Sequence, residues 1–130
     1  MPPPPANAPY CFGGLAVLEL ARSGAPLRAV ASFHGLLTTR RPAEPDTVSA
    51  RILACTGALD PLVPPEDVET FEAEMRASQA DWQLIVYGRA LHSFTNSSVD
   101  GLGDPRMAYD SSADRQSWAA LLGFLDESFA

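Results

Sequence analysis

Three short apolar runs, separated by helical or loop-like sequence, constrain the fold of this chain more than any other feature. The runs cover 27–33, 51–56 and 82–87. Helical patterns stand before the first run, between the second and third, and after the last. Such alternation is typical of a parallel sheet covered by helices. The sequence therefore predicts an α/β fold in which loops at the carboxyl ends of the strands carry the functional groups.

The first two predicted helices each have one apolar face. In the helix predicted over 15–23, which Gly24 ends, that face contains Leu15, Ala16, Leu18 and Ala21. The second helix is expected to begin at Pro65, a residue suited to a first helical turn. Its apolar residues are Val68, Phe71 and Met75, at helical spacing. Both helices are therefore expected to pack on the sheet through one face, and 36–50 and 57–65 are expected to be loops.

The last predicted helix has the clearest amphipathic pattern, with Ser112 as its expected N-cap. Its expected buried face contains Trp118, Leu121, Leu122, Leu125 and Phe129. We expect Trp118, Leu122 and Leu125 to be buried against the sheet together with Ile52, Leu84 and Val86.

Length and charge limit the classes of function. With 130 residues the chain forms one domain, expected over 10–130 after a proline-rich tail at 1–9. A net charge of −7 and no run among the nine basic residues argue against nucleic acid as a partner. The apolar runs are too short to span a membrane. Two cysteines and no signal segment favour a cytoplasmic protein, and the tail is expected to be solvated rather than an SH3- or WW-type ligand.

A reactive side chain followed by two glycines and a helical pattern is typical of a nucleophile elbow, a sharp turn from a strand into a helix. Here Cys11 is followed by Phe12, Gly13 and Gly14. Small residues let the strand and the helix approach closely. Pro9 stands where such elbows usually have a glycine, and no apolar strand precedes it. The alternative interpretation of Cys11 is a small buried apolar residue.

An acid and a base for this nucleophile follow two of the predicted strands. Cys11, Asp60 and His92 occur in the order nucleophile, acid, base, which is that of α/β-hydrolases. A thiol needs a base to ionise near neutral pH, and the base needs an acid that orients it. His34 is the competing base, but it precedes the acid, so we expect it to line the pocket or to be structural. Cys55 lies mid-strand and is expected in the core.

These motifs together resemble the dienelactone hydrolase family throughout residues 10–129. The matching segments are YCFGG, SFHG, GALDPLVPPEDV, ALHSFTN and AYDSSADRQSWAALLGFLDE. The resemblance implies an α/β-hydrolase fold and hydrolysis of an ester or lactone without metal or cofactor. It implies Cys11 as nucleophile, Asp60 as acid and His92 as base, with the backbone N–H of Phe12 as one oxyanion donor.

The resemblance implies only the C-terminal half of such a protein. The expected fold is a partial α/β-hydrolase fold, a short parallel sheet flanked by helices, with the N-terminal strands missing. The second oxyanion donor is then missing too, and weak activity of this chain alone is expected. Asn96 stands where the dienelactone-specific enzymes place an arginine, so a substrate of dienelactone type is not expected.

Two other interpretations stay open beside the hydrolase. One is a non-catalytic remnant or interaction module of the same fold, and the other is a redox-reactive thiol protein based on Cys11. A shortened sheet also exposes a strand edge, which predicts self-association through that edge.

Overall fold

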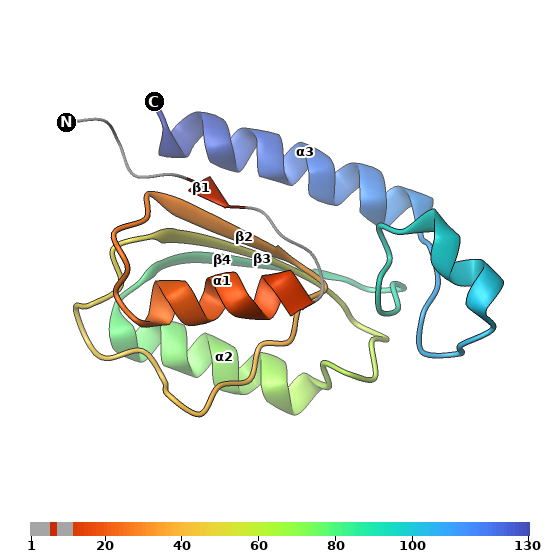
Figure 1. The fold of residues 1–130 in the computed structure, drawn as a ribbon, viewed down its shortest axis with the longest axis horizontal. Coiled ribbons are helices and arrows are strands. Elements are labelled where there is room, and N and C mark those ends of the chain that lie inside the picture. Colours follow the sequence, from red (N-terminus) through yellow and green to blue (C-terminus); the bar gives the residue numbers. More distant parts are fainter. Residues whose placement is uncertain (1–5, 8–11) are drawn as a thin grey trace.

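A computed structural model describes residues 6–7 and 12–130, and side chains from Gly13 onward. The α/β class is confirmed: the described strands form one parallel sheet in the order β1-β2-β3-β4 (Figure 1). The strands are β1 (Ala6–Asn7), β2 (Ala29–Phe33), β3 (Arg51–Gly57) and β4 (Asp81–Tyr87). The three strands expected from the apolar runs are all present.

Helices cover both faces of the sheet. They are α1 (Phe12–Arg22), α2 (Pro65–Ser78), α3 (Ser111–Ser128) and the short 3₁₀ helix η1 (Ser97–Leu102). Figure 1 shows α1 and α2 together on one face and α3 on the other. The three predicted helices are therefore confirmed. The connection from β2 to β3, residues 34–50, contains no helix.

The strand β1 differs from the expectation that no strand precedes the elbow. Ala6 pairs with Ala29 and Asn7 pairs with Val30, both in parallel register. These two residues keep the backbone N–H groups that proline lacks, and the four prolines at 2–5 stand before them. The segment expected to be a solvated tail therefore contributes a short edge strand, and the sheet has four strands rather than three.

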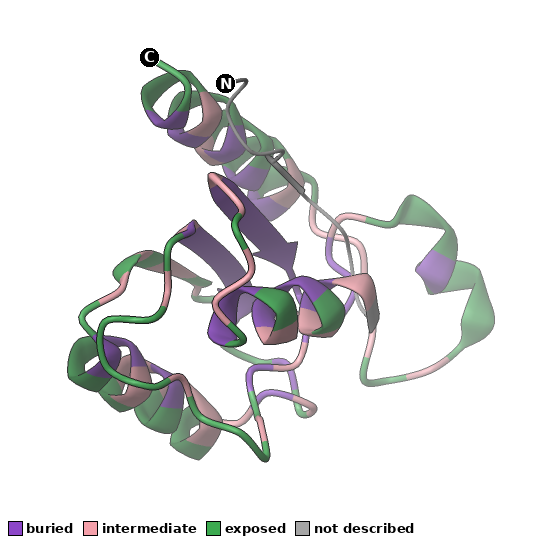
Figure 2. Cartoon of the chain, turned by 60° about the vertical axis from the view of Figure 1, so that its left-hand side comes forward, coloured by how far each residue is buried: buried purple, intermediate pink, exposed green. Residues whose placement is uncertain are grey.

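Two apolar clusters pack on the two faces of the sheet. One contains Val17 and Leu18 of α1 with Phe71 and Met75 of α2. The other joins Phe33 and Leu53 to α3. The strands β2 and β3 are buried, whereas β4 is partly exposed, and Figure 2 shows the outer faces of the helices exposed. On α1 the predicted Leu18 and Ala21 are buried and Leu15 is partly buried, whereas Ala16 is exposed and Val17 is buried in addition.

The predicted buried face of α3 is wrong. Trp118 is 52% exposed and Leu122 is 48% exposed, and only Leu121 of the predicted five is fully buried. The face that packs on the sheet contains Ala113, Ser117, Leu121, Phe124 and Ser128. Val86 is also exposed, because β4 lies at the end of the described strand order.

The physical reason for this error is two buried serines. Ser117 donates a hydrogen bond to the Asp114 carbonyl (3.1 Å), and Ser128 donates one to the Phe124 carbonyl (2.7 Å). A hydroxyl that is satisfied by its own helix can be buried without a partner elsewhere. Because the buried face contains these serines, the apolar pattern of the sequence instead marks the neighbouring stripe of α3, which is partly exposed.

The N-cap of α3 is Asp110, two residues earlier than the predicted Ser112. The carboxylate of Asp110 accepts a hydrogen bond from the N–H of Ala113 at 2.9 Å, whereas Ser112 lies within the helix and is exposed.

In the described part of the chain, no helix has both the length and the apolar character needed to span a membrane.

Candidate functional site

The carboxyl ends of three strands carry the polar residues that the sequence singles out. His34 follows β2, Asp60 lies in the turn after β3, and His92 follows β4. Because the strands are parallel, these ends meet at one edge of the sheet. All three side chains are buried there, with exposures of 1%, 2% and 7% respectively.

Asp60 and His92 form the central contact of this edge. Nδ1 of His92 and Oδ2 of Asp60 lie 2.8 Å apart, and the Asp60 side chain is fully buried. The other carboxylate oxygen, Oδ1, accepts a hydrogen bond from the Leu62 N–H at 2.8 Å. A carboxylate held in this way fixes the tautomer and the orientation of the imidazole, and stabilises the imidazolium that forms when Nε2 takes a proton.

A glycine lets the two loops that carry this pair approach each other. A Cβ atom on Gly57 would lie 2.3 Å from the Ala90 carbonyl oxygen and 2.7 Å from the carbonyl carbon. The contact is with backbone, which cannot swing away as a side chain can. The Leu59 N–H also donates to the Ala90 carbonyl at 3.0 Å. Gly57 is thus a site residue that sequence reasoning missed.

The backbone of His92 is held by a segment from the loop that follows η1. The His92 N–H donates to the Arg106 carbonyl (3.1 Å), and the Ala108 N–H donates to the His92 carbonyl (3.3 Å). The two segments form a parallel bridge between His92 and Met107. His92 is therefore fixed by its backbone on one side and by Asp60 on the other.

The predicted nucleophile, Cys11, lies outside the described residues. The described backbone begins again at Phe12, the first residue of α1. The first turn of α1 packs closely on the end of β2, since a Cβ on Gly35 would lie 2.9 Å from the Gly14 Cα. A Cβ on Gly14 would in turn lie 2.4 Å from Ser32 Oγ. Gly14 and Gly35 thus let the start of α1 approach the end of β2, and α1 begins beside the segment that carries His34.

His34 occupies the same edge and contacts the segment that carries His92. Its Nε2 lies 2.9 Å from Thr95 Oγ1. Its ring meets the ring of His92 edge to face, with centroids 5.6 Å apart. Burial, and then the neighbouring His92, lower the pKa of His34 to about 4, although Asp60 and a backbone hydrogen bond act in the opposite direction. His34 is therefore uncharged near neutral pH.

Cys55 is in the core, as expected. It is 2% exposed, and burial raises the pKa of its thiol to about 12. At neutral pH this thiol is protonated, so it is a poor nucleophile. Among the described residues, no group of three or more His, Cys, Asp or Glu side chains is placed to hold a metal ion.

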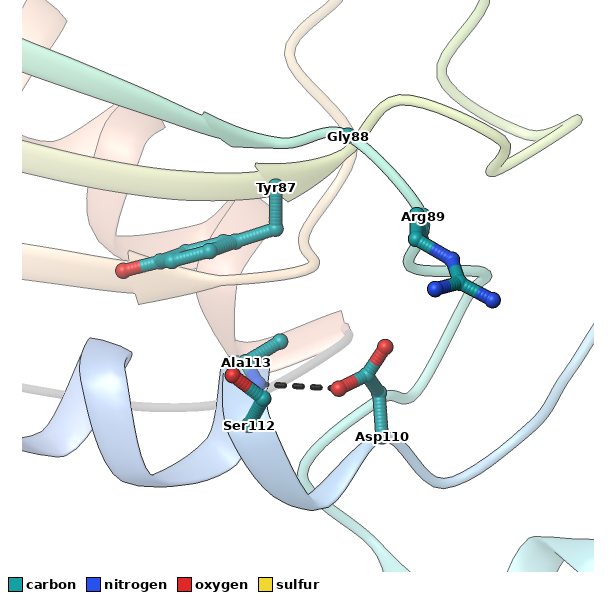
Figure 3. A pocket seen from close by; sticks show the side chains of 6 residues that line it. All are labelled: Tyr87, Gly88, Arg89, Asp110, Ser112 and Ala113. Carbon is teal, nitrogen blue, oxygen red and sulfur yellow. Dashed lines mark hydrogen bonds between the residues drawn. The ribbon is translucent and has the colours of Figure 1, made fainter.

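A pocket of about 400 Å³ lies between the end of β4 and the start of α3. Figure 3 shows Tyr87 and Arg89 on one side of it and Asp110, Ser112 and Ala113 on the other. The carboxylate of Asp110 is bonded to the N–H of Ala113, so it serves as the helix cap. None of the predicted site residues lines this pocket.

Comparison with known sequences gives a consistent set of relatives. The model of the dienelactone hydrolase family matches residues 8–129. An uncharacterised protein of Caenorhabditis elegans is 38% identical over 123 residues, which are 93% of this chain and 78% of that protein. A protein of Escherichia coli O157:H7, assigned by name to the carboxymethylenebutenolidases, is 29% identical over 121 residues. That match covers 87% of this chain and 42% of the Escherichia coli protein.

Solved structures resemble the described fold closely. A dienelactone hydrolase-like promiscuous phosphotriesterase from metagenomic libraries is 40% identical, with a TM-score of 0.88. The match covers 94% of this chain and 51% of that one. A carboxylesterase of Lactobacillus plantarum, at 16% identity and a TM-score of 0.66, shares the fold and is covered over 58% of its length. The chain thus spans little more than half of these solved chains.

Proposed function

Because the chain belongs to the dienelactone hydrolase family, we propose that it hydrolyses a carboxylic ester or a lactone by acyl transfer through Cys11, His92 and Asp60. The observation that carries the proposal is the buried hydrogen bond between Asp60 and His92 at the carboxyl edge of the sheet. A buried acid–imidazole pair beside the start of a helix is the part of a hydrolase site that activates a nucleophile.

Acylation begins at the thiol. The Sγ of Cys11 attacks the carbonyl carbon of the ester while Nε2 of His92 takes the thiol proton. The backbone N–H of Phe12 donates a hydrogen bond to the oxyanion that develops on the carbonyl oxygen. The bond to the alkoxy group then breaks, and His92 returns the proton to the leaving oxygen. The products of this step are an alcohol and a thioester on Cys11.

Deacylation repeats the same proton transfers with water. Nε2 of His92 takes a proton from the attacking water, the thioester bond breaks, and the proton goes to the sulfur of Cys11. The carboxylic acid leaves, and the enzyme is unchanged. Asp60 stays ionised through both steps and stabilises each imidazolium through its hydrogen bond to Nδ1.

Asn96, four residues after His92, favours a neutral ester as the first probe. Asn96 stands where an arginine would bind a substrate carboxylate, and its side chain accepts a hydrogen bond from the Ser98 N–H as the N-cap of η1. Its amide is thus used to begin a helix, and it carries no positive charge. A probe without a carboxylate, such as p-nitrophenyl acetate, therefore suits the site better than a dienelactone.

The test is the rate at which p-nitrophenyl acetate acylates the chain, measured by mass spectrometry with the acetyl group located by peptide mapping. We expect the label on Cys11. His92→Ala should slow acylation by roughly 10²–10⁴, the usual contribution of a general base, and Asp60→Asn should also slow it markedly. Cys55→Ala is the matched control, because its buried thiol should not react and the label should persist.

Acylation that does not depend on Cys11 and His92 would contradict the proposal. If acylation is unchanged in Cys11→Ser, or falls by less than about tenfold in His92→Ala, the triad is not used. The chain is then a non-catalytic module of the same fold. A parallel assay with a phosphotriester follows from the name of the metagenomic relative, and the same variants show whether such a substrate uses the same residues.

A further inference from the structure

His34 has a backbone conformation that its surroundings must maintain. Its φ is 46°, in the left-handed region that residues with a Cβ rarely adopt. Its N–H donates to the Cys55 carbonyl at 2.8 Å, which continues the sheet hydrogen bonding past the end of β2. Such strained residues persist where contacts over-determine them and cluster at functional sites. The strained backbone of His34 therefore indicates a functional role for its side chain.

The side chain of His34 contacts three residues of the loop that carries His92. Its ring lies edge to face against His92, with centroids 5.6 Å apart, and against Phe94, at 5.1 Å. Its Nε2 is 2.9 Å from Thr95 Oγ1. Between these contacts lies Ser93, which also has a positive φ, 57°. The loop of residues 92–95, here called the base loop, is thus gathered around one imidazole.

The charges around His34 show that it does not share the role of His92. The ionisable groups that act on it are His92, which follows β4, and Asp60, which follows β3. The Asp60 carboxylate is bonded to His92 and to the Leu62 N–H instead. His34 is uncharged near neutral pH, and its ring contacts His92, Phe94 and Thr95 of the base loop. It therefore contributes a neutral, hydrogen-bonding ring rather than a proton.

We propose that His34 is a positioning residue for His92, which acts through its hydrogen bond with Thr95 and its edge contact with the His92 imidazole. These contacts hold the base loop so that Nδ1 of His92 keeps its hydrogen bond to Asp60. The role of His92 as a base rests on the proposed function, but the positioning itself is a property of the fold and can be measured without substrate.

The first measurement is solvent exchange of the His92 Nδ1–H proton, followed by NMR of the ¹⁵N-labelled full chain. In Thr95→Val, which removes the hydroxyl and keeps the shape, we expect exchange to become about tenfold faster, as the loss of one hydrogen bond implies. Thr95→Ser restores the hydroxyl and should return the rate to that of the unchanged chain. Thr70→Val is the matched control, since the Thr70 hydroxyl bonds only to the Glu66 carbonyl on α2.

A second variant tests the same role through His34 itself, in case Thr95→Val does not fold. His34→Asn keeps a residue that tolerates positive φ but removes the ring, and its folded state is checked by the amide spectrum. It should speed exchange at His92 at least as much as Thr95→Val. If both variants fold and both leave the exchange rate and the titration midpoint of His92 unchanged, the positioning role is wrong.

The rate of acylation distinguishes failure of the positioning role from failure of the proposed function. For acylation by p-nitrophenyl acetate, Thr95→Val should lower the maximal rate about tenfold or more, because small displacements of a catalytic group are costly, without raising the half-saturating concentration. If the exchange results hold and Cys11 is not acylated in the unchanged chain, the proposed function fails and the positioning role stands. If acylation requires His92 but is insensitive to Thr95→Val and His34→Asn, the positioning role fails alone.

Discussion

A single buried imidazole makes the stability of this protein depend on pH. Burial lowers the pKa of His34 from 6.5 to about 4, so between these values the unfolded chain binds a proton that the folded chain does not. The stabilising contribution is complete above about pH 6.5 and is lost as the pH falls toward 4. Acid therefore favours unfolding through this residue, the direction expected of a histidine with a lowered pKa.

We predict that the free energy of unfolding falls by on the order of 2–3 kcal/mol more in the unchanged chain than in His34→Asn over this pH range. Urea unfolding of both proteins at several pH values measures the difference. Parallel pH profiles of the two proteins would contradict the prediction. The comparison between them removes the contributions of the carboxylates, which both proteins share.

Two adjacent leucines of α3, one buried and one exposed, test which face of the helix packs on the sheet. Leu121 is 3% exposed in the core, and Leu122 is 48% exposed on the outer face. Leu121→Ala should lower the free energy of unfolding by about 2–5 kcal/mol, the range for a buried leucine. Leu122→Ala should lower it by less than about 1 kcal/mol. Chemical unfolding of the two variants gives the answer, and equal losses would mean that the helix is rotated from the position described here.

The start of the same helix offers a second matched pair. The Asp110 carboxylate accepts a hydrogen bond from the Ala113 N–H, whereas Ser112 lies within the helix and is exposed. Asp110→Ala should reduce the stability by roughly 0.5–2 kcal/mol, the usual cost of losing a cap, and Ser112→Ala should have little effect. A larger loss in Ser112→Ala, seen in thermal or urea unfolding, would restore the cap predicted from the sequence.

The elements that could be predicted are those whose signal is local. The apolar runs locate β2, β3 and β4, and Pro65 marks the first residue of α2. The juxtaposition of Asp60 and His92, 32 residues apart, follows from parallel strands whose ends meet at one edge. The need for Gly57 could not be predicted, because it arises from the Ala90 backbone across the site. The buried face of α3 was missed because Ser117 and Ser128 are satisfied within the helix.

In the whole molecule, one buried ion pair connects parts that are distant in the sequence. Arg22 of α1 bonds to both carboxylate oxygens of Glu74 on α2, at 2.8 and 2.9 Å. The same guanidinium donates to the Leu37 carbonyl (2.6 Å), and Glu74 accepts from the Ala43 N–H (2.9 Å). The pair thus joins both helices to the long connection between β2 and β3, which contains no helix of its own.

Breaking this pair from one side should be costly. We predict that Arg22→Met lowers the free energy of unfolding by about 3–5 kcal/mol, because the buried Glu74 carboxylate is left without its cation. Glu74→Leu should cost less, because Arg22 keeps its ion pair with Glu19 at 2.7 Å. The double variant should lose much less than the sum of the two single losses. A double-mutant cycle by urea unfolding measures this coupling, and additive losses would show that the two side chains act independently.

Self-association is predicted at the edge where earlier strands of a longer sheet would pair. In the described part of the chain that edge is β1, which begins the strand order and pairs with β2. Sedimentation velocity over a range of concentrations should show association that Asn7→Lys weakens, since lysine on an edge strand opposes pairing. Leu20→Lys is the control, because Leu20 is exposed (47%) on α1 and not on the strand edge. A monomer at every concentration would contradict the prediction.

The two tryptophans of the chain stand on opposite faces of the sheet. Trp82 is partly buried, with its ring edge to face against Phe71 at 6.4 Å, and belongs to the cluster under α1 and α2. Trp118 is on the outer side of α3 and is 52% exposed. Their fluorescence therefore reports two different environments, a shielded one and one that a dissolved quencher can reach. With one tryptophan replaced by phenylalanine at a time, loosening of either helical layer can be followed optically without an attached dye.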